Sequence, residues 1–97
     1  MIRHVVMFKF KDDASNDDRA GFVEMLYKLA DEVPQVRQLE VGNNFTDSPR
    51  ACDLVLVVDL DDEAALKAYA AHPNHQPVLQ RAGEVCAASY VVDYTLA

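Results

Sequence analysis

The chain has 97 residues, of which 51% are hydrophobic, and its 9 basic and 16 acidic residues give a net charge of −7. A hydrophobic fraction this high excludes a disordered chain, and the length predicts a single domain over residues 1–97. The acidic balance repels phosphate backbones and anionic membrane surfaces, so we expect neither nucleic acid nor a membrane as a partner.

The first half of the chain predicts a strand, a helix and a weaker strand. Residues 2–10 are rich in valine and phenylalanine, which is typical of a strand. Ser15 precedes three residues with side-chain oxygens and is a good N-cap, and apolar residues then recur at helical steps until Pro34. Residues 36–45 predict the second strand, in which Gly42 is compatible with a bulge.

Residues 52–60 form the most apolar of the predicted strands. A second helix follows, for which Asp61 or Asp62 serves as the N-cap. Its inner face carries Leu66 and Tyr69.

Two prolines then interrupt the second helix. Pro73 and Pro77 predict a break and a short irregular or helical turn through residues 78–79, and residues 85–94 form the last strand. The resulting order, βαββαβ, predicts a ferredoxin-like α+β fold. Such a fold has an antiparallel four-stranded sheet with the helices on one face, and its first strand lies between the third and the fourth.

The second face of this sheet is also apolar. In the first strand Val6 and Phe8 point one way, while Val5 and Met7 point the other, and the third and last strands follow the same pattern. Two helices cover one face only, and a large apolar face in contact with water marks an interface. We therefore expect a homodimer that packs open sheet face against open sheet face.

The targeting signals and the cysteines give only general expectations. The first residues carry early charges and no cleavage site of small residues, and the longest apolar run, residues 54–58, is too short to span a bilayer. We expect a cytoplasmic protein, in which Cys52 and Cys86 are free thiols packed as small hydrophobic side chains.

Three histidines are the remaining candidates for chemistry. His72 and His75 lie three residues apart, and His4 opens the first strand. Together they would form a centre that titrates near neutral pH. Zinc binding by His72 and His75 is disfavoured, because a proline separates them and only one other histidine exists, so we predict no metal.

The chain resembles the stress-responsive A/B barrel (Dabb) family, whose members are dimeric α+β barrels. The matching stretches are residues 4–12, 34–36, 39–42, 53–60, 69–75 and 91–94, the fifth of which reads Tyr-Ala-Ala-His-Pro-Asn-His. The resemblance covers nearly the whole chain in the right order. It implies the fold and the dimer but no single activity, since many members have no assigned reaction. It implies no cofactor.

The family also includes a plant polyketide cyclase that closes an aromatic ring by an aldol-type condensation. Resemblance to that enzyme implies that His75 is the general base and that Tyr69 and His4 orient the substrate. If the helices cover the His4 face of the sheet, these residues lie in a pocket lined by Phe8, Phe22 and Leu26. The cyclase has a pocket tyrosine where this chain has Leu26, so a different pocket shape is expected.

Three functional hypotheses follow. The first is a non-catalytic dimer whose histidines cap helices or bond within the core. The second is a small-molecule pocket, either a binding site or a cyclase-like enzyme. The third is a cofactor-independent monooxygenase of the same dimeric barrel type. A cavity that encloses His4 and His75 favours a pocket, whereas a filled core with both histidines bonded to the backbone favours a structural role.

Overall fold

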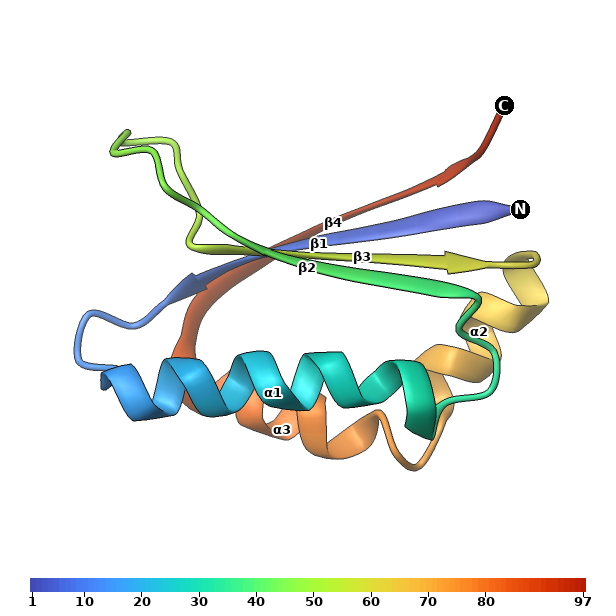
Figure 1. Ribbon diagram of the computed structural model, residues 1–97, viewed down its shortest axis with the longest axis horizontal. Helices are drawn as coiled ribbons and strands as arrows, with labels where there is room; N and C mark the ends of the chain where they lie inside the picture. Colours follow the sequence, from blue (N-terminus) through green and yellow to red (C-terminus); the bar gives the residue numbers. More distant parts are fainter.

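The computed structural model describes all residues from Met1 to Ala97, with a four-stranded sheet on one layer of helices (Figure 1). The elements are β1 (Ile2–Phe10), α1 (Asn16–Glu32), β2 (Gln38–Asn43), β3 (Leu54–Leu60), α2 (Glu63–Ala71), α3 (Gln76–Val85) and β4 (Cys86–Thr95). All strand pairs are antiparallel in the order β2-β3-β1-β4. The predicted ferredoxin-like α+β fold, with β1 between β3 and β4, is confirmed.

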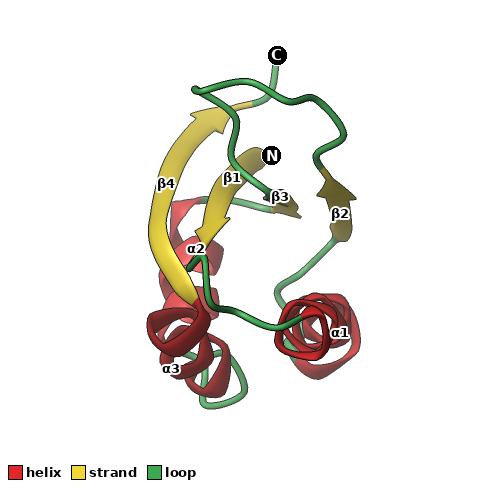
Figure 2. Ribbon diagram, turned by 90° about the vertical axis from the view of Figure 1, so that its left-hand side faces the viewer, coloured by secondary structure: helices red, strands yellow, loops and turns green.

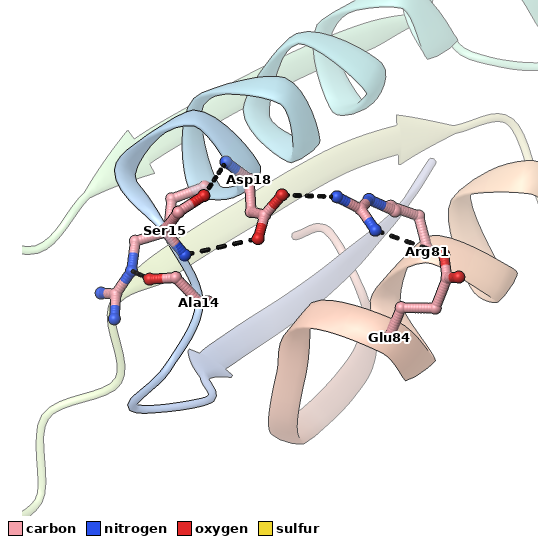
Figure 3. Close-up of polar contacts among 6 residues, drawn as sticks. Ala14, Ser15, Asp18, Arg81 and Glu84 are labelled. Atoms are coloured by element: carbon pink, nitrogen blue, oxygen red, sulfur yellow. Dashed lines mark hydrogen bonds and ion pairs between the residues drawn. The ribbon is translucent and has the colours of Figure 1, made fainter.

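The predicted N-caps of α1 and α2 are also confirmed. Ser15 and Asp18 form a reciprocal capping box, with the Asp18 N–H donating to Ser15 Oγ at 3.0 Å. Figure 3 shows that the Asp18 carboxylate also accepts from Arg81 of α3, at 2.9 Å, so the start of α1 is tied to α3. Hydrogen bonding to Ser15 and the Arg81 charge hold the pKa of Asp18 below its ordinary value. Asp62 caps α2 by accepting from the Ala65 N–H at 2.8 Å.

Two local predictions are wrong. The turn expected at residues 78–79 is the ten-residue helix α3, because Pro77 lies in its first turn, where no backbone N–H is needed and the proline ring favours a helix start. Gly42 is not in a bulge, since β2 pairs with β3 without a shift, and the irregularity lies at Lys9 and Phe10 against β4. A side chain at position 42 would come within 3.2 Å of Val55 Cγ1, so glycine permits a close approach there.

The core lies between the helices and one face of the sheet. Alternate residues of β1 and β3, such as Phe8 and Leu56, pack against Phe22, Leu26 and Leu29 of α1, which are fully buried. Figure 2 shows α1 beneath β2 and β3, while α2 and α3 lie beneath β1 and β4. None of the helices is long and apolar enough to cross a bilayer.

We call the other face of the sheet the open face. The pairing register places on it Arg3, Val5, Met7 and Lys9 of β1, Gln38, Glu40 and Gly42 of β2, Val55, Val57 and Asp59 of β3, and Ala88, Tyr90, Val92 and Tyr94 of β4. No helix covers this face (Figure 1). Tyr90 and Val92 are each 57% exposed, so the predicted apolar face is present and in contact with solvent.

Candidate functional site

A cavity of about 290 Å³ lies between the β1–β4 half of the sheet and helices α2 and α3. Its lining residues are His4, Val6, Phe8, Leu56, Leu66, Tyr69, Ala70, His75, Val78, Leu79, Ala82, Ser89 and Val91. Most of the wall is hydrophobic, and the only polar side chains in it are those of the two histidines, the tyrosine and the serine. An apolar cavity with a few converging polar groups is the usual form of a small-molecule site.

The fold brings His4, Tyr69 and His75 together from three elements. His4 points toward the helices because it shares the face of Val6 and Phe8 on β1, Tyr69 lies in the last turns of α2, and His75 is the N-cap residue of α3. The Tyr69 ring lies between the histidines, with ring centroids 5.7 Å from His4 and 4.6 Å from His75. His4 thus meets two residues that lie 65 and 71 positions further along the chain.

His75 is buried, with 8% of its surface exposed. Its Nδ1 lies 3.1 Å from the Ala70 carbonyl oxygen, and because a carbonyl only accepts, Nδ1 carries the proton. Burial, aided by the neighbouring His4 and His72, lowers the pKa of His75 below its ordinary value. The ring is therefore neutral at neutral pH, and its Nε2 carries a lone pair.

His4 forms a pair with Asp93 that the sequence analysis missed. The two residues face each other across the β1–β4 ladder, and His4 Nδ1 lies 2.5 Å from Asp93 Oδ1. The carboxylate accepts, so it fixes the ring orientation and the tautomer of His4 and leaves Nε2 free on the other side. Asp93 lies in the matching stretch at residues 91–94, but only the register of β4 against β1 reveals its partner.

The Tyr69 hydroxyl is the one polar atom of the cavity wall that is buried and has no hydrogen-bond partner. Burial raises the pKa of Tyr69 to about 12, so the hydroxyl stays protonated and can donate. An unpaired buried hydroxyl costs free energy, which makes this group available to an acceptor that enters the cavity.

The predicted lining of the pocket needs correction. Phe8 lines the cavity, but Phe22 and Leu26 are fully buried behind it, with the Phe22 ring edge-on to Phe8 at 5.1 Å. The reason is that α1 covers the β2–β3 half of the sheet, whereas the cavity lies above α2 and α3. The cavity is also lined by residues of β4 and of α3, a helix for which the sequence predicts only a turn.

His72 lies outside the cavity and serves the turn between α2 and α3. It is the C-cap of α2, and its Nδ1 accepts from the Asn74 N–H at 3.1 Å. The Asn74 side chain donates to the Glu32 carbonyl at 2.8 Å and so fastens this turn to the end of α1. No group of three His, Cys, Asp or Glu side chains is arranged to hold a metal ion.

Comparison with known proteins gives consistent matches. The family model described as Stress responsive A/B Barrel Domain matches residues 2–96. An uncharacterized protein of Streptomyces coelicolor is 39% identical over 79 residues, which are 78% of this chain and 80% of that protein. A dimeric ferredoxin-like protein of unknown function from Thermobifida fusca superposes with a TM-score of 0.87 at 27% identity, over 98% of this chain and 90% of the other.

A Dabb family protein with a ferredoxin-like fold from Mesorhizobium loti superposes with a TM-score of 0.83. It is 22% identical, and the match covers 99% of this chain and 96% of that protein. At this level of sequence identity, the similarity shows only that the two proteins share a fold.

Proposed function

Because this chain belongs to the stress-responsive A/B barrel domain family, we propose that it is a homodimer that binds a small, largely apolar carbonyl compound. Each subunit binds the ligand in its own cavity, with the carbonyl oxygen of the ligand beside the Tyr69 hydroxyl. The observation that carries this proposal is the buried Tyr69 hydroxyl, which has no partner within the protein.

The cavity sets the class of ligand. Its volume of about 290 Å³ is just below the roughly 300–1,000 Å³ that is usual for ligand sites, so the ligand is small. The hydrophobic wall favours an apolar body. The tyrosine hydroxyl supplies a donor, so the ligand needs an acceptor, and a carbonyl oxygen meets that need at little desolvation cost.

The open face supports the homodimer. The Thermobifida fusca relative is described as dimeric, and the exposed Tyr90 and Val92 lie on a face that no helix of this chain covers. Burying such a face against a second copy removes it from water by a closed two-fold contact.

The same cavity favours a proton transfer next to the carbonyl, as in an aldol-type ring closure. His75 Nε2 takes a proton from the carbon adjacent to the carbonyl, and the electron pair of that C–H bond moves to the oxygen. Tyr69 donates a hydrogen bond to the oxygen as charge develops there. The resulting enolate carbon then takes back a proton or attacks a second carbonyl. The specific support is that Nδ1 of His75 is already committed to Ala70, so only Nε2 is free.

Binding is tested with acetophenone and with α-methylstyrene, which has the same shape but a CH₂ group in place of the oxygen. In a titration followed by amide NMR, acetophenone shifts the signals of Ala70, His75 and Ser89, and α-methylstyrene binds about tenfold more weakly because it makes no hydrogen bond. Equal affinities, or shifts confined to residues outside the cavity, would contradict the proposal.

Proton transfer is tested by exchange of the acetophenone methyl protons in D₂O, followed by loss of their NMR signal. The protein accelerates this exchange above the buffer rate, and His75→Asn abolishes the acceleration. Asparagine is the matched variant, because its amide can still donate to the Ala70 carbonyl while Nε2 is lost. An unchanged rate in this variant would exclude His75 as the base.

A further inference from the structure

An arm of residues 44–53 joins β2 to β3 and rises from the sheet on the side away from the helices (Figure 1). Phe45 lies at its base and is 98% exposed. Beside it is a hollow of about 280 Å³ on the open face, lined in part by Met7, Cys52 and Val55. A single copy therefore presents a free aromatic ring directly next to its uncovered apolar sheet.

The charge of the open face suits contact with an identical copy. Its charged residues are Arg3 and Lys9, which are positive, and Glu40 and Asp59, which are negative, so the face is neutral while the whole chain carries −7. Arg3 and Asp59 pair with each other at 2.7 Å. Two copies can meet at this face without the like-charge repulsion that the rest of the surface would produce.

The apolar area points to a contribution from the arm. With about 150–250 Å² for each aromatic side chain, the exposed 57% of Tyr90 and 45% of Tyr94 amount to roughly 150–250 Å², to which Val92 and Met7 add their exposed parts. These side chains alone fall short of the about 800 Å² that each partner gives to a stable interface, a total that also includes the polar atoms of the face. The nearly complete exposure of Phe45 adds about 200 Å², the largest single contribution.

We propose that the arm of each copy reaches across the two-fold axis and packs Phe45 onto the open face of the second copy, beside the partner's Tyr90. The inference rests on the proposed homodimer and identifies Phe45 as the residue that stabilises the contact between the two copies. A central aromatic side chain that is exposed in one copy and buried in the pair is the usual form of a hot spot.

The dissociation constant of the dimer, measured by sedimentation over a dilution series, tests the arm. Phe45→Ser raises the constant about tenfold or more. Its circular dichroism spectrum stays that of the wild type, and so does its Tm at dilutions where both proteins are monomeric, because the Phe45 side chain is 98% exposed within one copy. Val92→Asp, on the receiving face, weakens the dimer as well.

Tyr27→Ser is the matched control, since Tyr27 is an exposed aromatic residue of α1, on the helix side of the molecule. It leaves the dissociation constant unchanged. If Val92→Asp weakens the dimer and Phe45→Ser does not, the arm proposal is wrong and the open-face homodimer stands. If the wild type is monomeric throughout the series, both are wrong, and the acetophenone titration still tests the cavity separately.

Discussion

Replacing Tyr69 by phenylalanine separates the stability of the fold from the binding of a ligand. The variant keeps the ring, whose centroid lies 4.6 Å from that of the His75 ring, and removes only the buried hydroxyl that has no partner. An unpaired buried hydroxyl costs about 1–3 kcal/mol, and a water in the cavity would offset part of that cost. We therefore expect the free energy of unfolding to stay equal or to rise by up to about 2 kcal/mol.

In a domain of this size each kcal/mol corresponds to about 4–8 °C in Tm, which calorimetry resolves. The same substitution weakens acetophenone binding about tenfold, because one hydrogen bond of about 1–1.5 kcal/mol is lost. The affinity for α-methylstyrene does not change. Tyr27→Phe is the control, since its hydroxyl donates to the Val41 carbonyl outside the cavity, and this variant binds acetophenone normally. A loss of more than about 1 kcal/mol in Tyr69→Phe would refute the reasoning.

Three further predictions concern the walls of the site and their titration. His75→Ala lowers the free energy of unfolding by about 1–3 kcal/mol, since the hydrogen bond to Ala70 is lost. His75→Asn lowers it less, because its amide can still donate to the Ala70 carbonyl. Equal stabilities of the two variants in urea unfolding would show that this hydrogen bond contributes nothing. The lowered pKa of His75 means that the unfolded chain takes up more protons on acidification, so the stability decreases as the pH falls below about 6.5. In His75→Asn the free energy of unfolding changes less with pH between about pH 7 and 5, where the carboxylates stay charged. An unchanged pH dependence would show that other groups cause it. Phe22→Ala lowers the free energy of unfolding by about 3–5 kcal/mol, because Phe22 is fully buried in the core. A variant that keeps its stability and only loses affinity for acetophenone would show that Phe22 belongs to the cavity wall.

The fold followed from the sequence because its signals are local. Alternation in the strands, the cap at Ser15 and the stop at Pro34 each depend on neighbouring residues, and together they leave few topologies. The sequence does not predict α3 at Pro77, because a proline has the same local effect whether it ends one helix or starts the next. Only the continued helix up to Val85 distinguishes the two.

The candidate site could be predicted in part. The placement of His4 on the helix side of β1 follows from the alternation of side chains, and this brings it to Tyr69 and His75. Asp93 could not be found in this way, because its contact with His4 depends on the register of β4 against β1. Phe22 is wrongly assigned to the pocket because the sequence does not show which helix covers which half of the sheet, and in the structure α1 lies under β2 and β3, away from the cavity (Figure 2).

A crystal structure of the protein soaked with acetophenone tests the central proposal most directly. We predict that the carbonyl oxygen lies about 2.7 Å from the Tyr69 hydroxyl, the usual O–H···O distance. The methyl group should face Nε2 of His75, and the phenyl ring should lie against Phe8 and Val78. An empty cavity with acetophenone bound elsewhere, or a ligand whose oxygen points away from Tyr69, would contradict the proposal.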